Sequence, residues 1–164
     1  RNARARNLEE SKKDNFINDM IQILNYNLTR PKFNGKALYI RIHESGDFYN
    51  LNYLRAWQSI ANYFKGNDRI VFQAYTKSLP LLKQIDLNNT NIKFVYSIMA
   101  DTDPIHVKEA RLLGLTTFSA MHENDISIKD TVCPGSCGPC TKCYTGPTEN
   151  IVIAYHGSRK NKIV

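Results

Sequence analysis

The sequence predicts an α/β fold in which helices flank a mostly parallel sheet of about five strands. Two features carry this prediction. Short runs rich in β-branched and aromatic residues alternate with amphipathic segments, and a polar or glycine-containing loop follows most of these runs. Strands that alternate with helices pair in parallel through right-handed crossovers. A partial, half TIM-like barrel and an open doubly wound sheet both fit this order of elements.

The first predicted elements are a helix, a strand and a second helix. Apolar residues recur every three or four positions over residues 8–27, which predicts one amphipathic helix before the Asn34-Gly35 turn. Residues 37–42 alternate and are rich in strand formers, so they predict the first strand. Asn50 is a favourable N-cap, and an apolar face that includes Trp57 predicts a helix after it.

Four further strands are predicted at residues 69–75, 92–97, 115–121 and 150–155. A short helix over residues 79–85 follows the second strand, with Ser78 as its cap. Asp103 and Pro104 open the helix after the third strand, and Gly114 ends it. The length of 164 residues suits a single domain over residues 1–164.

Polar side chains gather directly after the predicted strands. The carboxyl ends of parallel strands lie at one edge of a sheet, where ligands bind. Lys77 beside a helix N-terminus suits a phosphate or carboxylate, so we expect a small anionic ligand. The alternative is a local role, because residues 43–47 and Thr76 can instead cap the helices that follow them. The candidate ligand-binding residues are His43, Glu44, Ser45, Asp47, Tyr75, Thr76, Lys77, Ser97, Asp101 and His156.

All four cysteines fall inside residues 133–143, within a metal-binding loop that we place at residues 130–147. Glycines and prolines between them let the backbone turn sharply, so that the thiolates can converge on one metal centre. A 4Fe-4S cluster is favoured because iron–sulfur clusters accept thiolates from one compact loop. Structural zinc is the alternative, although zinc sites usually hold two ligand pairs about 12 or more residues apart. The predicted metal ligands are Cys133, Cys137, Cys140 and Cys143.

Disulfides are a third interpretation of the cysteines. They are disfavoured because the basic start of the chain has no apolar region of the kind that follows in a secretion signal. The spacing from Cys133 through Cys137 to Cys140 is also that by which radical S-adenosylmethionine enzymes hold a four-iron cluster. S-adenosylmethionine is therefore a further candidate cofactor, and Cys143 would either close the open iron or lie outside the cluster.

The formal net charge is +7, and the basic excess lies largely at the two ends of the chain. Basic ends favour weak, salt-dependent binding of nucleic acid. No apolar run approaches the ~20 residues that a bilayer span needs, so we expect no membrane association. The chain begins without methionine, and we expect an N-terminal segment to be missing. The basic end residues are Arg1, Arg4, Arg6, Lys12, Lys13, Arg159, Lys160 and Lys162.

Several motifs together resemble the phage and plasmid gene product 88 family, over nearly all of the chain. They are His43-Glu-Ser-Gly-Asp-Phe-Tyr49 with Trp57, Tyr75-Thr-Lys-Ser78, the cysteine cluster from Cys133-Pro134, and a strand ending in His156. Members of that family usually begin with a further cysteine-containing segment. Their strand-end pattern is similar to radical S-adenosylmethionine-like barrels, which makes Lys77 and residues 45–47 candidates for a cofactor or substrate pocket.

Two functions are consistent with these features. The first is an iron–sulfur metal-binding protein of phage or plasmid origin in the cytoplasm of a bacterial host, acting as a redox or radical enzyme on a small anionic ligand at the strand ends. The alternative is a non-catalytic, zinc-stabilised binding module that contacts a host protein or nucleic acid. No catalytic acid–base pair can be assigned from the sequence.

Overall fold

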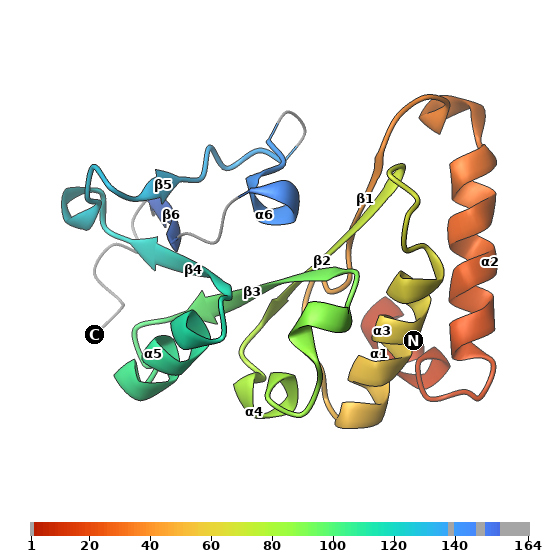
Figure 1. Ribbon diagram of the computed structural model, residues 1–164, viewed down its shortest axis with the longest axis horizontal. Helices are drawn as coiled ribbons and strands as arrows, with labels where there is room; N and C mark the ends of the chain where they lie inside the picture. The colour runs from red at the N-terminus through yellow and green to blue at the C-terminus, as the bar shows by residue number, and fades with distance from the viewer. Residues whose placement is uncertain (1, 138–139, 147–149, 155–164) are drawn as a thin grey trace. The chain divides into compact units, whose positions relative to one another are not determined.

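The computed structural model describes residues 2–137, 140–146 and 150–154 (Figure 1). Its helices are α1 (Ala3–Glu10), α2 (Phe16–Thr29), α3 (Leu51–Tyr63), α4 (Leu79–Leu82), α5 (Pro104–Leu112) and α6 (Lys142–Thr145), with short 3-10 helices η1 (Pro31–Phe33), η2 (Leu87–Asn89) and η3 (Glu123–Asp125). Its strands are β1 (Leu38–Arg41), β2 (Ile70–Thr76), β3 (Ile92–Ile98), β4 (Thr116–Met121), β5 (Thr131–Val132) and β6 (Asn150–Ala154).

The strands form a parallel sheet in the order β1-β2-β3-β4-β6-β5, so the predicted α/β class is confirmed. β1 to β4 follow one another without reversal, which is the winding of a partial barrel. A doubly wound sheet instead reverses its strand order near the middle. The chain divides into two compact units, one of residues 1–72 and 80–92 and the other of residues 73–79 and 93–164.

In the first unit, α3 supplies much of the core. The side chain of Asn50 accepts a hydrogen bond from the backbone N–H of Tyr53 at 2.8 Å, so the predicted N-cap is confirmed. The predicted apolar face of α3 is largely buried, and α2 packs against this helix (Figure 1). Phe16 of α2 lies edge-on to the Trp57 ring, with the ring centroids 5.7 Å apart. The buried apolar residues here include Leu24, Leu54, Trp57, Ile60, Ala61, Phe64, Ile70 and Phe72.

The single helix predicted over residues 8–27 is wrong, because the structure has two helices, α1 and α2, with a break at residues 11–15. Ser11 ends α1, since its hydroxyl donates to the Leu8 carbonyl at 2.8 Å. Such local side-chain hydrogen bonds compete with helix continuation. Residues 11–15 also contribute no apolar side chain to the periodic face of α2. The apolar spacing of α2 was read correctly but extended too far toward the N-terminus.

In the second unit, β3, β4, β6 and β5 pair in parallel. The prediction of about five strands missed β5, which has only two residues and therefore no periodicity to detect. β5 matters for the cysteines because the pairing continues into them: the backbone N–H of Cys133 donates to the Val152 carbonyl of β6 at 2.7 Å. The first cysteine is thus anchored to the sheet.

The two faces of this sheet are covered by different segments. Burial raises the pKa of Tyr96 in β3, and the carboxylate of Glu109 in α5 raises it further, so α5 lies on the Tyr96 face. Phe118 is paired with the residue after Tyr96 and therefore points to the opposite face. There the Phe118 ring meets Tyr75, and the Tyr75 hydroxyl reaches Cys143 of α6. Hence α5 and α6 cover opposite faces.

Candidate functional site

A pocket of ≈ 470 Å³ opens in the first unit beside the loop from β1 to α3, and we name it the β1–α3 pocket. Residues 42–47 of the loop line it, followed by Tyr49 and Tyr53. Four of the residues predicted from the sequence, at positions 43, 44, 45 and 47, are therefore brought together. One face of α1 lines the same pocket with Arg4, Asn7, Leu8 and Ser11.

His43 is the most buried polar residue of this pocket, with 9% of its surface exposed. Its Nε2 lies 3.2 Å from the Tyr53 hydroxyl, and its ring packs edge-on to Phe48 at a centroid distance of 4.7 Å. Burial lowers the pKa of His43; the Asp47 carboxylate opposes this shift and Arg41 adds to it. The other ring nitrogen, Nδ1, has no hydrogen-bond partner among the described residues.

The remaining loop residues combine a sharp turn with exposed polar groups. Gly46 has a φ of 87°, a left-handed conformation that glycine adopts without a steric penalty. Glu44 and Ser45 are exposed, whereas Asp47 is half-buried and accepts a hydrogen bond from the backbone N–H of Phe48 at 2.7 Å. Backbone and side chain together fix the Asp47 carboxylate in the loop.

Sequence reasoning missed the aromatic and α1 side of the β1–α3 pocket. Tyr49 stacks on Tyr53 with the ring centroids 4.5 Å apart and an interplanar angle of 16°. The Tyr49 hydroxyl also lies 3.1 Å from the Ser11 hydroxyl, which connects the loop to α1. Tyr49 is the last residue of the motif at positions 43–49 and Tyr53 lies in α3, but neither was selected as a ligand-binding residue. The α1 residues carry no sequence signal that places them there, because contact over 38 positions depends on the fold.

The cysteine segment lies in the second unit. All four thiols are free, Cys137 being exposed and the other three half-buried. Two sulfurs accept hydrogen bonds: Cys133 Sγ from the backbone N–H of Gly135 at 3.5 Å, and Cys143 Sγ from the Tyr75 hydroxyl at 3.0 Å. Gly135 has a φ of 74°, which suits the turn that brings its N–H back to the sulfur. Two of the predicted metal ligands therefore already have donors directed at sulfur.

The pKa of Cys143 depends on the other three thiols. Burial raises the pKa of Cys143, the hydrogen bond from Tyr75 lowers it, and the charges of Cys133, Cys140 and Cys137 each raise it. The other three thiols thus lie near enough to Cys143 to affect its pKa. No group of three His, Cys, Asp or Glu side chains within residues 2–137, 140–146 and 150–154 is arranged to hold a metal ion.

The structure places Thr76, Lys77, Ser97 and Asp101, four more of the predicted ligand-binding residues, in the second unit. Thr76 is buried, and its hydroxyl accepts a hydrogen bond from the backbone N–H of Ser78 at 2.9 Å, in support of the local role considered for it. Lys77 and Asp101 are exposed, and Ser97 is half-buried on the same sheet face as Phe118. His156 lies outside the described residues. A single rim shared with the β1–α3 pocket stays a prediction.

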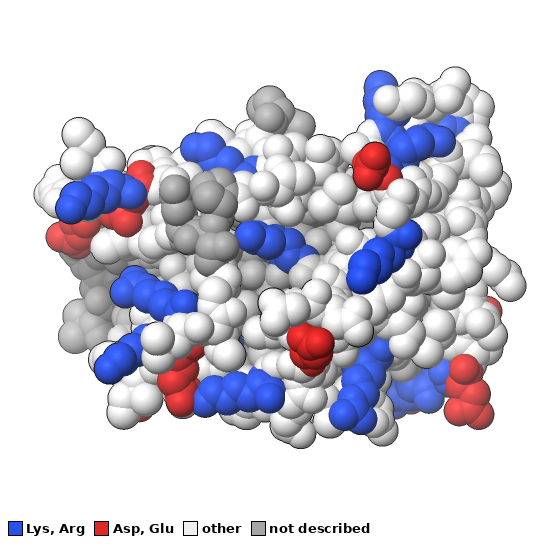
Figure 2. Space-filling view, in the orientation of Figure 1, with Lys and Arg blue, Asp and Glu red and all other residues white. Residues whose placement is uncertain are grey.

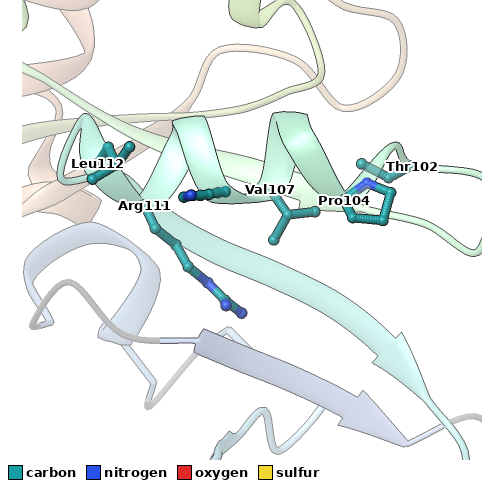
Figure 3. A pocket seen from close by; sticks show the side chains of 6 residues that line it. Thr102, Pro104, Val107, Arg111 and Leu112 are labelled. Carbon is teal, nitrogen blue, oxygen red and sulfur yellow. The ribbon is translucent and has the colours of Figure 1, made fainter.

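A second hollow of ≈ 470 Å³ lies along α5 in the second unit. Val107 and Arg111 extend to the same side of the helix there (Figure 3). Pro104 and Leu112 line the same shallow surface. The sequence did not indicate this surface, because the residues that line it have the pattern of an ordinary amphipathic helix.

The basic residues at the start of the chain are partly neutralised by neighbours. Lys12 pairs with Glu9 at 2.9 Å and Lys13 with Glu10 at 2.7 Å, while Arg4 is exposed on α1. Lys and Arg side chains are spread over the visible face, with Asp and Glu between them (Figure 2). The basic residues predicted near the C-terminus lie outside the described part of the chain. Within that part, no helix is long and apolar enough to span a bilayer.

Comparison with known proteins identifies the family. The sequence profile of Gene product 88 matches residues 1–112, a stretch that contains the whole β1–α3 pocket and ends with α5, before the cysteine segment. Comparisons with curated proteins and with solved structures found no match. The predicted similarity to radical S-adenosylmethionine-like barrels stays a prediction. Because the profile covers more than half of the 164 residues, the chain belongs to the Gene product 88 family.

Proposed function

We propose that Cys133, Cys137, Cys140 and Cys143 hold an iron–sulfur cluster, and that the protein uses this cluster in a redox or radical reaction. The observation that carries the proposal is the hydrogen bond from Tyr75 to the Cys143 sulfur, together with the one from Gly135 to Cys133. Hydrogen bonds to sulfur stabilise the thiolate form and set the reduction potential of a cluster.

Metal binding would also offset the repulsion between the thiolates of the four cysteines. Burial and the three neighbouring thiols raise the pKa of Cys143, so several thiolates disfavour one another when no cation is present. A metal centre held by Cys133, Cys137, Cys140 and Cys143 would supply the compensating positive charge and favour their thiolate forms. The final ligand geometry would therefore form on metal binding and need not exist before it.

The role of Cys143 decides which kind of cluster protein this is. With four cysteine ligands the cluster is closed and serves electron transfer. With Cys143 outside, one iron is open to S-adenosylmethionine, which supplies the radical chemistry when bound. Cys143 lies on α6 rather than in the turn region of Cys133, so the two arrangements can be separated by mutation. The small anionic ligand is proposed to bind at the end of β2, beside Tyr75 and Lys77.

The experiment is anaerobic purification followed by measurement of iron, sulfide, zinc and the visible spectrum. About four irons and four sulfides per chain with broad brown absorption are expected. Each cysteine-to-serine variant should lower the iron content, whereas Ser136→Ala, an exposed change inside the same segment, should not. If Cys143→Ser alone keeps its iron, the open-cluster arrangement is favoured. Wild-type iron content in all four cysteine variants would refute the cluster.

A zinc-stabilised binding module is the second candidate, favoured by the exposed Arg4 and Arg6 on α1 and by the net charge of +7. One zinc per chain and no colour would support it. Its partner would be nucleic acid or a host protein. Binding of a DNA duplex that falls steeply with rising salt is expected for phosphate contacts. Absence of binding at low salt would remove nucleic acid as the partner.

A further inference from the structure

The end of α2 and the 3-10 helix η1 form a basic surface in the first unit, which we name the α2–η1 surface (Figure 1). Residues 20–43 contain no aspartate or glutamate, whereas three cations fall between positions 30 and 36. None of these three cations forms an ion pair with another described residue. Their charges are therefore available to an anionic partner. The surface consists of Tyr26, Arg30, Lys32, Phe33 and Lys36.

Arg69 holds the two parts of the α2–η1 surface together. Its guanidinium donates to the carbonyl of Leu28 in α2 and to that of Phe33 in η1, each at 3.1 Å. The residue before it, Asp68, is exposed and offsets the charge of Arg69. The nearest carboxylate before the surface in the chain is Asp19, in the first turn of α2. The positive excess of Arg30, Lys32 and Lys36 is therefore retained, on a surface that is formed before any partner binds.

Aromatic rings lie beside these cations. Tyr26 is 67% exposed, and the guanidinium carbon of Arg30 lies 6.0 Å from the centroid of its ring. Lys32 Nζ lies 4.6 Å from the centroid of the half-buried Phe33 ring. Proteins that bind single-stranded nucleic acid combine the same two features, because bases stack on aromatic rings while cations contact the phosphates. The exposure of Tyr26 leaves its ring accessible to a base.

Base stacking favours a single strand over other polyanions. In a duplex the base faces are already stacked on one another, so an exposed tyrosine meets no free base. A lipid surface would instead favour a helix with a broad exposed apolar face. On α2, all of which the structure describes, the exposed large apolar side chains are Ile23 and Tyr26 alone. These two are too few for a helix that inserts into lipid.

We propose that the α2–η1 surface binds single-stranded nucleic acid. Tyr26 stacks on a base, and Arg30, Lys32 and Lys36 contact the phosphates. Every base has a face that can stack, so the binding has little sequence preference. The proposal requires no metal. It also differs from the zinc-stabilised binding module, whose basic residues lie on α1, because it assigns the contacts to another surface and to stacking.

The test is a fluorescence anisotropy titration of the full chain against a labelled thymidine oligonucleotide of about 12 nucleotides. The oligonucleotide should bind, and an abasic strand of equal length should bind at least about tenfold more weakly. Tyr26→Ala should weaken binding of the oligonucleotide by a similar factor, because it removes the ring on which a base stacks. Tyr26→Phe keeps the ring and should bind as the wild type does.

The salt dependence tests the cations. Three phosphate contacts to a single strand predict a slope of about −2 for the logarithm of the binding constant against that of the salt concentration. Lys32→Gln combined with Lys36→Gln removes two contacts and should reduce this slope by about 1.4. Arg55→Gln removes an exposed cation from α3 in the same unit and is the matched control, so it should leave the slope unchanged.

The proposal would be overturned by no binding up to about 100 μM protein at low salt, by a duplex or abasic strand that binds as tightly, or by unchanged affinity in Tyr26→Ala. Binding of phosphatidylserine vesicles that is lost in Tyr26→Ala would assign the surface to a membrane instead. Trp57 fluorescence shows whether each variant is folded, because this tryptophan is buried in the same unit. A Cys133→Ser variant should bind the oligonucleotide as the wild type does, which separates this surface from the metal centre.

Discussion

The Tyr75 hydroxyl donates a hydrogen bond to the Cys143 sulfur across 3.0 Å, which connects β2 to α6 over 68 positions of sequence. A hydroxyl donor stabilises the thiolate more than the thiol, because the negative sulfur is the better acceptor. In the metal-free protein this contact lowers the pKa of Cys143 and so opposes the larger effect of burial, which raises it. The tyrosine thereby offsets part of the rise in the pKa of Cys143 that burial causes.

Tyr75→Phe should slow the alkylation of Cys143 at pH 8 in metal-free protein. Removing the donor takes away an interaction that lowers the pKa, so the pKa rises and the thiolate fraction at pH 8 falls. Iodoacetamide labelling followed by peptide mass spectrometry measures the rate at Cys143, with Cys137 in the same sample as an internal reference. Phe118→Leu changes the neighbouring ring but keeps the hydroxyl and is the control. An unchanged rate in Tyr75→Phe would contradict the assigned role.

Much of the fold could be predicted because its signals are local. The Asn50 cap and the apolar face around Trp57 predicted α3, and runs of strand-forming residues predicted β1 to β4. The break between α1 and α2 and the two-residue β5 were missed. In each case the deciding interactions were a single side-chain hydrogen bond or pairing with another strand, which leave no periodic pattern.

In the candidate site, too, some residues could be predicted from local sequence signals and others could not. Residues 43–47 were predicted because polar residues directly after a strand mark its carboxyl end. The wall formed by α1 was not, since Ser11 meets Tyr49 only through the tertiary fold. Tyr75 and Cys143 were each selected from the sequence, but their contact was not. Sequence order indicates which edge of a sheet a residue reaches, and side-chain packing decides which partner it meets there.

Two adjacent threonines of β4 should respond oppositely to the same substitution. The hydroxyl of Thr117 donates to the Asn150 side chain at 2.9 Å, whereas the buried hydroxyl of Thr116 has no partner among the described residues. Thr117→Val should lower the free energy of unfolding by about 1 kcal/mol, and Thr116→Val should raise it by about 1 kcal/mol. Urea unfolding followed by circular dichroism compares them. Destabilisation by Thr116→Val would mean that its hydroxyl has a partner, such as water or a ligand.

Leu54→Ala should strongly destabilise the first unit. Leu54 is fully buried in α3, and truncating a buried leucine costs about 2–5 kcal/mol through lost burial and a residual cavity. The only tryptophan of the chain, Trp57, lies on the same helix and reports the unfolding of this unit through its fluorescence. Asn52→Ala, an exposed change on α3, should alter the stability by less than about 0.5 kcal/mol. Similar effects of both changes would contradict the burial of this helix face.

The stability of the first unit should fall as the pH is lowered through the range just below 6.5. Burial lowers the pKa of His43 from its ordinary value of 6.5, with Asp47 opposing the shift and Arg41 adding to it. Between this value and the lower pKa of the folded state, the unfolded chain binds more protons than the folded one, so acid favours unfolding. The stabilisation is fully present above pH 6.5 and is lost as the pH falls through the pKa of the folded state.

His43→Gln should flatten this pH dependence, because glutamine does not titrate. Urea unfolding monitored by Trp57 fluorescence at a series of pH values between about 5 and 8 measures the slope. His106→Gln removes an exposed histidine from α5 and should leave the slope unchanged. A slope in His43→Gln equal to that of the wild type would show that another group carries the pH dependence. The buried His43 of the β1–α3 pocket would then be protonated equally in the folded and unfolded states, contrary to its burial against Phe48 and Tyr53.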